Sequence, residues 1–126
     1  MTSHFPTPEG PARLYVEARR PAPDTYVITV AGDLDRHSRD RLDDSVRTVL
    51  AVRPATVLVE LSGTRFMDSS GLTSLINAYR AALRTGTRFA LVAPTEPVSR
   101  ILALTGIDQV LDSYPTCEAA LRRTVG

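Results

Sequence analysis

Two short polar segments hold the residue types that could do chemistry. The segment GDLD contains Asp33 and Asp35, and the segment DSSG contains Asp68, Ser69 and Ser70 in a row. Carboxylates of this kind serve in acid–base chemistry, and hydroxyls serve as nucleophiles or as sites of modification. Each possibility needs its own further residues, which the rest of the chain either supplies or lacks.

The chain lacks the residues that catalysis by a serine nucleophile requires. A strand–turn–helix nucleophile needs the pattern G-x-S-x-G. Here Met67 stands two residues before Ser69, and Asp68 stands two residues before Ser70. Of the two histidines, one lies near the N-terminus, and His37 is expected to be a solvated residue at a helix start. The sequence therefore predicts no catalytic residue and no enzyme activity.

Metal and cofactor sites are also not expected. One cysteine and two separated histidines form no ligand cluster. Asp33, Asp35 and Asp68 could hold a hard cation, but no loop has the ligand spacing of a calcium site. Asp33 is interpreted as a turn residue, because Asp bonds its local backbone. Nucleotide binding stays open, since helix N-termini at a parallel sheet bind phosphate, although DSSG has only one glycine.

Composition limits the classes of partner. The chain has 126 residues and a net charge of +1, which argues against nucleic acid and against a charged membrane-surface helix. No apolar run approaches the length of a membrane span, and the N-terminus lacks the apolar core of a signal peptide. The single Cys117 suits a reducing compartment, so a cytoplasmic protein is expected.

The elements that must position the two polar segments follow from apolar patterns. Residues 1–12 are rich in proline and predict a flexible tail, and residues 13–126 predict one domain. Strands are predicted at residues 13–18, 25–31, 56–61, 88–93 and 109–111. Helices are predicted at residues 39–52, 69–85, 96–106 and 115–123. The prolines of RRPAPD are expected to end the first strand, and SGTRFMD is expected to be a loop.

The order β-β-α-β-α-β-α-β-α predicts an α/β fold with a mixed, mostly parallel sheet covered by helices. Ser38 is a candidate cap of the first helix, and Gly86 a candidate terminator of the second. The core-facing residues expected on these two helices are Leu42, Val46, Val49, Leu50, Leu72, Leu75, Ile76, Tyr79 and Leu83.

Sites in such sheets form at the carboxyl ends of the strands. If the second and third strands are neighbours, Asp33, Asp35, Asp68, Ser69 and Ser70 lie near one another. Asp68 or Ser69 can cap the helix that follows, which leaves a hydroxyl in its first turn. A phosphate there would be tolerated by the fold, because helix N-termini favour negative charge.

The segments VAGDLD, VELSGTRFMDSSGLTSLINAYRAAL and VSRILALTGIDQVL, which span about Leu14 to Leu121, resemble a bacterial anti-sigma-factor antagonist of the STAS-domain family. The resemblance implies a single STAS domain. Its expected partner is an anti-sigma factor that is a serine kinase of the GHKL ATPase type, and binding that kinase would free a sigma factor. A PP2C-type phosphatase is the other expected partner.

The resemblance also assigns roles to residues. It implies phosphorylation at the second serine of the motif, Ser70, which would block the complex. Glu60 and Asp33 depart from the residues usual in the family, without affecting Ser70. The partner-binding residues expected around Ser70 are Asp33, Asp35, Met67, Asp68, Ser69 and Gly71. A nucleotide- or small-ligand-sensing STAS module is the alternative, and a generic scaffold, in which neither serine matters, is a third possibility.

Overall fold

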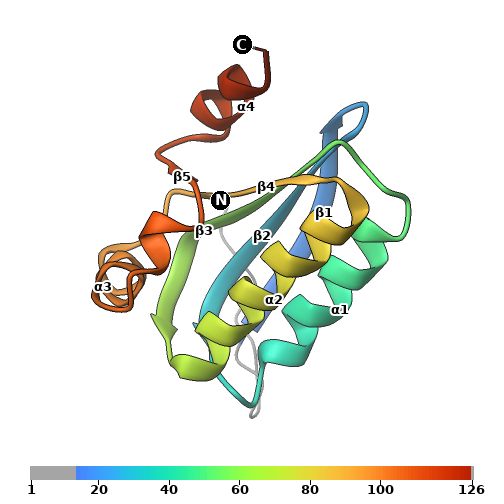
Figure 1. The fold of residues 1–126 in the computed structure, drawn as a ribbon. Helices are drawn as coiled ribbons and strands as arrows, with labels where there is room; N and C mark the ends of the chain where they lie inside the picture. The colour runs from blue at the N-terminus through green and yellow to red at the C-terminus, as the bar shows by residue number, and fades with distance from the viewer. Residues whose placement is uncertain (1–13, 126) are drawn as a thin grey trace, which may run out of the picture.

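The computed structural model describes residues 14–125, with side chains through residue 122, so the predicted tail at residues 1–12 lies outside the described residues. A five-stranded sheet is combined with four α-helices (Figure 1). In chain order the elements are β1 (Leu14–Ala22), β2 (Thr25–Leu34), α1 (Arg39–Leu50), β3 (Thr56–Met67), α2 (Ser69–Thr85), β4 (Arg88–Val92), α3 (Glu96–Leu104), the 3-10 helix η1 (Ile107–Gln109), β5 (Ser113–Tyr114) and α4 (Cys117–Val125).

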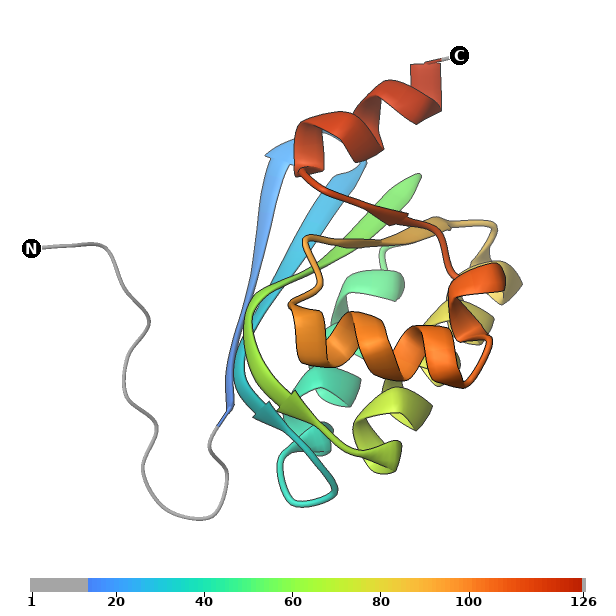
Figure 2. The same ribbon diagram turned by 90° about the vertical axis from the view of Figure 1, so that its left-hand side faces the viewer.

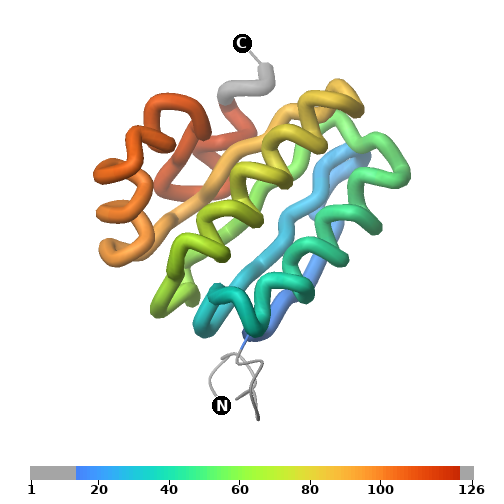
Figure 3. The backbone as a smooth tube through the Cα atoms, turned by 60° about the horizontal axis from the view of Figure 1, so that its bottom comes forward, coloured from blue at the N-terminus to red at the C-terminus, as the bar shows by residue number. Residues whose placement is uncertain are grey.

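The sheet has the strand order β1-β2-β3-β4-β5. Strand β1 pairs antiparallel with β2 at one edge, and every later pair is parallel. The predicted mixed α/β sheet and its element order are confirmed. Figure 2 shows α1, α2 and α3 on one side of the sheet, and Figure 3 shows α1 and α2 running side by side along it.

Successive side chains of the strands point to opposite faces of the sheet and form two apolar clusters, one on each face. Ile28, Val57, Val59 and Leu91 belong to the large core shared with α1, α2 and α3. The smaller cluster contains their strand neighbours and one residue of α4: Val27, Leu58, Ala90, Val92 and Ala120. Because adjacent strand residues point to opposite faces, α4 packs on the face of the sheet that the other helices leave. In residues 14–125 no helix is both long and apolar enough to cross a membrane.

Three predicted strand ends were wrong. Strand β1 continues through Ala22, past both the predicted end and Pro21, where its pairing register shifts. Strand β2 runs to Leu34 and β3 to Met67, through segments predicted as loops. The pairing of β2 with β3 shifts register twice, so that β3 carries extra residues opposite β2. Such bulges bend a strand and interrupt its pairing. The segments here also contain polar residues and glycine, so they lack the alternation of apolar and polar residues by which a strand is predicted.

Two further predictions need correction. Leu83 is 60% exposed, and Ala82 is the buried residue of that turn instead. The predicted strand at residues 109–111 is absent: η1 and a turn occupy this region, and the edge strand β5 lies two residues later. By contrast, the predicted core residues of α1 are all buried, and Gly86 ends α2 with a φ of 70°.

Candidate phosphorylation and partner-binding site

The carboxyl ends of β2 and β3 lie side by side. Leu34 of β2 is paired with Met67 of β3, and the Asp68 amide donates to the Leu34 carbonyl oxygen at 3.3 Å. The chain leaves β2 into the loop that begins at Asp35 and leaves β3 directly into α2. The expectation that the two strands are neighbours is therefore confirmed, and both polar segments lie at one edge of the sheet.

Asp68 caps α2. Its backbone is extended, with φ of −105° and ψ of −171°, and its Oδ1 accepts a hydrogen bond from the Gly71 amide at 3.0 Å. Its carbonyl oxygen accepts from the Leu72 amide at 3.0 Å. A side chain at this position satisfies one of the amides that the first helical turn leaves unpaired. Of the two candidate caps, Asp68 fills the role and Ser69 is the first residue of the helix.

Ser69 and Ser70 are the first and second residues of α2. The Ser69 side chain is exposed and the Ser70 side chain is partly exposed. Within the described residues, neither hydroxyl forms a hydrogen bond, although the Ser69 carbonyl accepts from the Thr73 hydroxyl at 2.9 Å. The first turn contains no acidic residue. Both hydroxyls are thus available at the positive end of a helix dipole.

Gly71 lies where α2 meets the ends of β2 and β3. A Cβ at this residue would overlap the Leu34 carbonyl oxygen and would lie 2.7 Å from Met67 Cγ. Met67 is 2% exposed, and Gly71 is buried as well. Neither residue can present a side chain to a partner. Both residues hold the start of α2 against the sheet, and the partner contact expected of them stays a prediction.

Asp35 organises the loop before α1. Its Oδ1 accepts from the amides of His37 and Ser38, at 3.0 and 3.1 Å, and from the Ser38 hydroxyl at 3.1 Å. Its carbonyl oxygen accepts from the Arg39 amide at 2.8 Å. Asp35 therefore has a structural role in this loop. No hydrogen bond to its Oδ2 is formed within residues 14–125, so this oxygen is available to a partner.

Ser38 occupies the N-cap position of α1, but its side chain does not cap the helix. Its hydroxyl donates to the Asp33 carbonyl oxygen at 2.6 Å and accepts from the Asp35 amide at 3.1 Å. The predicted cap is thus correct in position and wrong in bonding. Ser38 is buried, and its hydroxyl links this loop to the end of β2.

Asp33 lies in β2, so its interpretation as a turn residue was wrong. Its carboxylate forms an ion pair with Arg65 of β3 at 3.4 Å, with the arginine side chain 66% exposed. Phe66, paired with Asp33 across the strands, is 50% exposed. Neither Arg65 nor Phe66 is among the partner-binding residues expected from the sequence.

Residues 14–125 contain no group of three or more His, Cys, Asp or Glu side chains that could hold a metal ion. The site therefore offers two unbonded hydroxyls at the start of α2, which Asp68 caps. The paired ends of β2 and β3 at this end of the sheet also carry Asp33, Arg65 and Phe66.

Comparison with known proteins gives the chain a family context. The family model described as STAS domain matches residues 15–120. A putative anti-sigma factor antagonist TM1081 homolog of Thermotoga neapolitana is 34% identical over 70 residues, which cover 56% of this chain. The match spans 62% of that relative, less than two thirds of its length. The anti-sigma-F factor antagonist RsfB of Mycobacterium tuberculosis is 26% identical over 111 residues, covering 79% of this chain and 90% of the relative.

A solved structure is similar over nearly the whole chain. The crystal structure of an anti-sigma factor antagonist from Mycobacterium paratuberculosis superposes with a TM-score of 0.83 at 26% identity. The match covers 93% of this chain and 98% of the other.

Proposed function

The chain belongs to the STAS domain family, and from that premise we propose that it is an anti-sigma-factor antagonist. Its unphosphorylated form binds an anti-sigma factor that is a serine kinase of the GHKL ATPase type, and this binding releases a sigma factor. Phosphorylation of Ser70 ends the interaction, and a PP2C-type phosphatase restores it. The protein acts in the cytoplasm as a switch and as a substrate, and not as an enzyme.

The proposal rests on the separate roles of Asp68 and Ser70 at the start of α2. Asp68 does the capping through its bond to the Gly71 amide, so the helix does not need the Ser70 hydroxyl. Ser70 has no hydrogen bond within the described residues and is partly exposed. A kinase can reach such a hydroxyl, and its modification removes no bond from the fold.

A phosphate at Ser70 has opposite consequences for the fold and for a partner. It adds about −1.5 to −2 of charge at the positive end of α2, where the helix dipole favours an anion. The same charge lies close in the chain to the Asp68 carboxylate, at the end of the sheet that the proposed partner must approach. A loss of about 3 kcal/mol from repulsion and lost contacts is enough to weaken binding roughly a hundredfold.

The partner surface extends beyond the serine. Phe66 gives it an exposed aromatic ring, and aromatic residues are enriched at the energetic centres of interfaces. Asp35 Oδ2, just past the end of β2, and the exposed Ser69 hydroxyl, at the start of α2, offer polar contacts at the same end of the sheet. A partner that fits this surface has an apolar pocket for the ring and donors for the carboxylates. The similarity of the chain to anti-sigma factor antagonists supports an anti-sigma factor in this role.

Binding and competition test this function. The unphosphorylated protein is titrated into a complex of a candidate GHKL-type anti-sigma factor with its sigma factor, and release of the sigma factor is followed by gel filtration. Ser70→Ala should release sigma as the wild type does, and Ser70→Asp should release little or none. Equal release by Ser70→Asp and the wild type would contradict the proposed switch.

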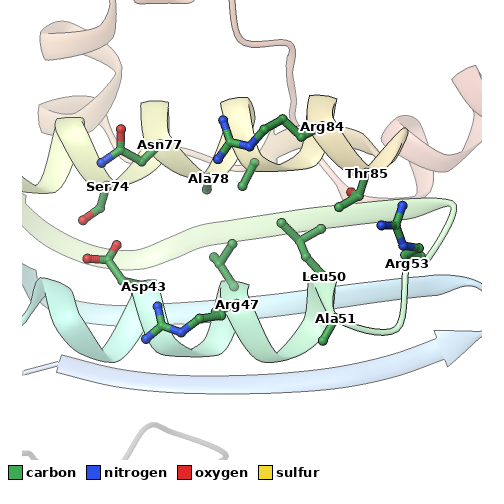
Figure 4. Close-up of a pocket in the computed structure, with 12 residues that line it drawn as sticks. Asp43, Arg47, Leu50, Ala51, Arg53, Ser74, Asn77, Ala78, Arg84 and Thr85 are labelled. Carbon is green, nitrogen blue, oxygen red and sulfur yellow. The ribbon is translucent and has the colours of Figure 1, made fainter.

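The alternative, a nucleotide- or small-ligand-sensing module, has one observation in its favour, a groove between α1 and α2 (Figure 4). Calorimetry with ATP, GTP and their diphosphates, without any protein partner, separates the two functions. Saturable micromolar binding of a nucleotide favours the sensor, and binding of the kinase favours the antagonist.

A further inference from the structure

The second face of the sheet, opposite α1, α2 and α3, is covered at one end only. Helix α4 packs there in the cluster that contains Val27, Leu58, Ala90 and Val92. Figure 2 shows α4 at the end of the sheet where β2 and β3 begin, and among the described residues no other helix lies on this face. The half of the face toward the carboxyl ends of β2 and β3 therefore has no helix over it.

Phe66 and Asp33 point to this uncovered half. They are paired across β3 and β2, and the residues that follow them, Met67 and Leu34, both belong to the large core on the other face. Successive strand residues point to opposite faces, so the side chains of Phe66 and Asp33 point to the second face. Half of the Phe66 side chain remains exposed there.

Two more side chains complete this surface. Tyr15 of β1 is partly exposed and is paired with Ala31, which lies two residues before Asp33 and so on the same face. The Arg65 guanidinium reaches the Asp33 carboxylate at 3.4 Å, and its side chain is 66% exposed. We call the surface formed by Tyr15, Ala31, Asp33, Arg65 and Phe66 the open face.

The chain that precedes β1 enters the structure beside the open face. Leu14, the first residue of β1, is paired with Gly32, which adjoins Asp33. Phe66 lies two strands away from β1, which corresponds to about 10 Å at about 4.8 Å between strands. About three or four extended residues span that distance, and the 13 residues before Leu14 span about 45 Å when extended. This segment is therefore long enough to cross the open face.

The composition of the segment fits the open face. Residues 5–11 have the sequence FPTPEGP, with three prolines, one aromatic residue and one acid. Proline-rich segments dock on aromatic side chains in the polyproline II conformation, and the open face supplies the rings of Tyr15 and Phe66. The carboxylate of Glu9 is complementary to the exposed Arg65. Prolines restrict the free chain, so docking costs less conformational entropy.

We propose that residues 5–11 dock on the open face and cover Phe66. The consequence for regulation rests on the proposed antagonist function. The docked segment competes with the anti-sigma factor for Phe66, so it must leave before the partner can bury the ring. This competition requires neither a kinase nor a phosphate, and it acts on the same end of the sheet as Ser70.

Paramagnetic relaxation measured by nuclear magnetic resonance tests the docking on the full chain without any partner. A nitroxide is attached to Thr7→Cys in a Cys117→Ser background, since Cys117 is the single cysteine of the chain. The amide signals of Ala31, Asp33 and residue 66 should broaden, and those of α1 and α2 should not. Broadening spread evenly over both faces of the sheet would overturn the proposal.

A second pair of labelled variants separates docking from the nearness that attachment to β1 imposes. Phe66→Ser should reduce the broadening at Asp33 by more than half, because it removes the ring on which the segment docks. Val52→Ser is the matched control, since Val52 is 62% exposed and follows α1 on the other face of the sheet, and it should change nothing. Equal broadening at Asp33 in both variants would contradict docking.

Affinity measurements test the competition. A full-length variant with glycine at Phe5, Pro6, Pro8 and Pro11 should bind the anti-sigma factor about fivefold more tightly than the wild type, and Thr2→Gly should bind as the wild type does. Equal affinity of the glycine variant and the wild type would overturn the competition. Failure of every form to bind an anti-sigma factor would refute the proposed function instead, and the spin-label result would still decide the docking.

Discussion

The backbone of Gly71 at the start of α2 lies directly against the carbonyl group of Leu34 at the end of β2. The contact leaves no space for a Cβ at residue 71. It fixes the first turn of α2 relative to the sheet, and Ser69 and Ser70 belong to that turn. The position of the proposed phosphorylation site is therefore determined by a contact between two backbones.

Replacing Gly71 with Ala should destabilise the protein by about 1–3 kcal/mol. The new methyl group would meet a backbone oxygen and the buried Met67 side chain, and overpacking of this kind costs energy despite the better helix propensity of alanine. Urea denaturation measures the loss, with the exposed Ser69→Ala as control. Unfolding midpoints of Gly71→Ala and the wild type that coincide would refute the close contact.

Replacing Asp68 with Ala should cost about 1 kcal/mol, because the bond to the Gly71 amide is lost and the helix start is left uncapped. Asp68→Asn keeps an acceptor oxygen and should lose less than half as much, through the weaker interaction with the helix dipole. Thermal unfolding of the two variants gives the comparison. Equal losses would mean that charge, and not the hydrogen bond, is the contribution of Asp68.

Asp35 should affect both stability and binding, and two variants separate the effects. Asp35→Ala removes the acceptor of three hydrogen bonds and should lower stability by about 1–2 kcal/mol. Asp35→Asn keeps an acceptor for the two amides and should stay close to wild-type stability. If the carboxylate contacts the partner, Asp35→Asn still weakens binding to the anti-sigma factor. Wild-type affinity of Asp35→Asn would restrict Asp35 to its structural role.

Phe66→Ala should weaken binding of the anti-sigma factor at least about tenfold, because an exposed aromatic at the end of β3, two residues before the cap Asp68, is a candidate interface anchor. Its stability should remain near that of the wild type, since half of the side chain is already exposed. Val52→Ala is the matched control: Val52 is 62% exposed and follows the opposite end of α1. Surface plasmon resonance with the immobilised partner measures both. Equal affinities of the two variants would remove Phe66 from the interface.

Much of the framework follows from the sequence because its signals are local. Apolar runs and helical spacing predict the element order, and Asp68 next to an apolar helix predicts the cap. The ends of β2 and β3 could not be predicted in this way. Most of their residues are polar or glycine, and these segments remain in the sheet because two bulges shift the register of pairing between the strands.

Residues whose roles depend on distant neighbours were also missed. Leu83 and Ala82 fit helical spacing about equally well, and only the packing of α2 against the sheet decides which is buried. The Ser74 hydroxyl is an ordinary helix residue in the sequence, and its lack of a partner appears only when α1 is placed beside α2. The two carboxylates of GDLD look alike in the sequence, but Asp33 pairs with Arg65 and Asp35 organises a loop.

The location of the phosphate is the most direct test of the proposed switch at Ser70. The protein is incubated with ATP and its GHKL-type anti-sigma kinase, and intact mass followed by fragmentation identifies the modified residue. We predict one phosphate on Ser70 of the wild type, modification of Ser69→Ala and no modification of Ser70→Ala. The unfolding midpoint of Ser70→Ala should be close to that of the wild type. A phosphate on Ser69, with Ser70→Ala still modified, would contradict it.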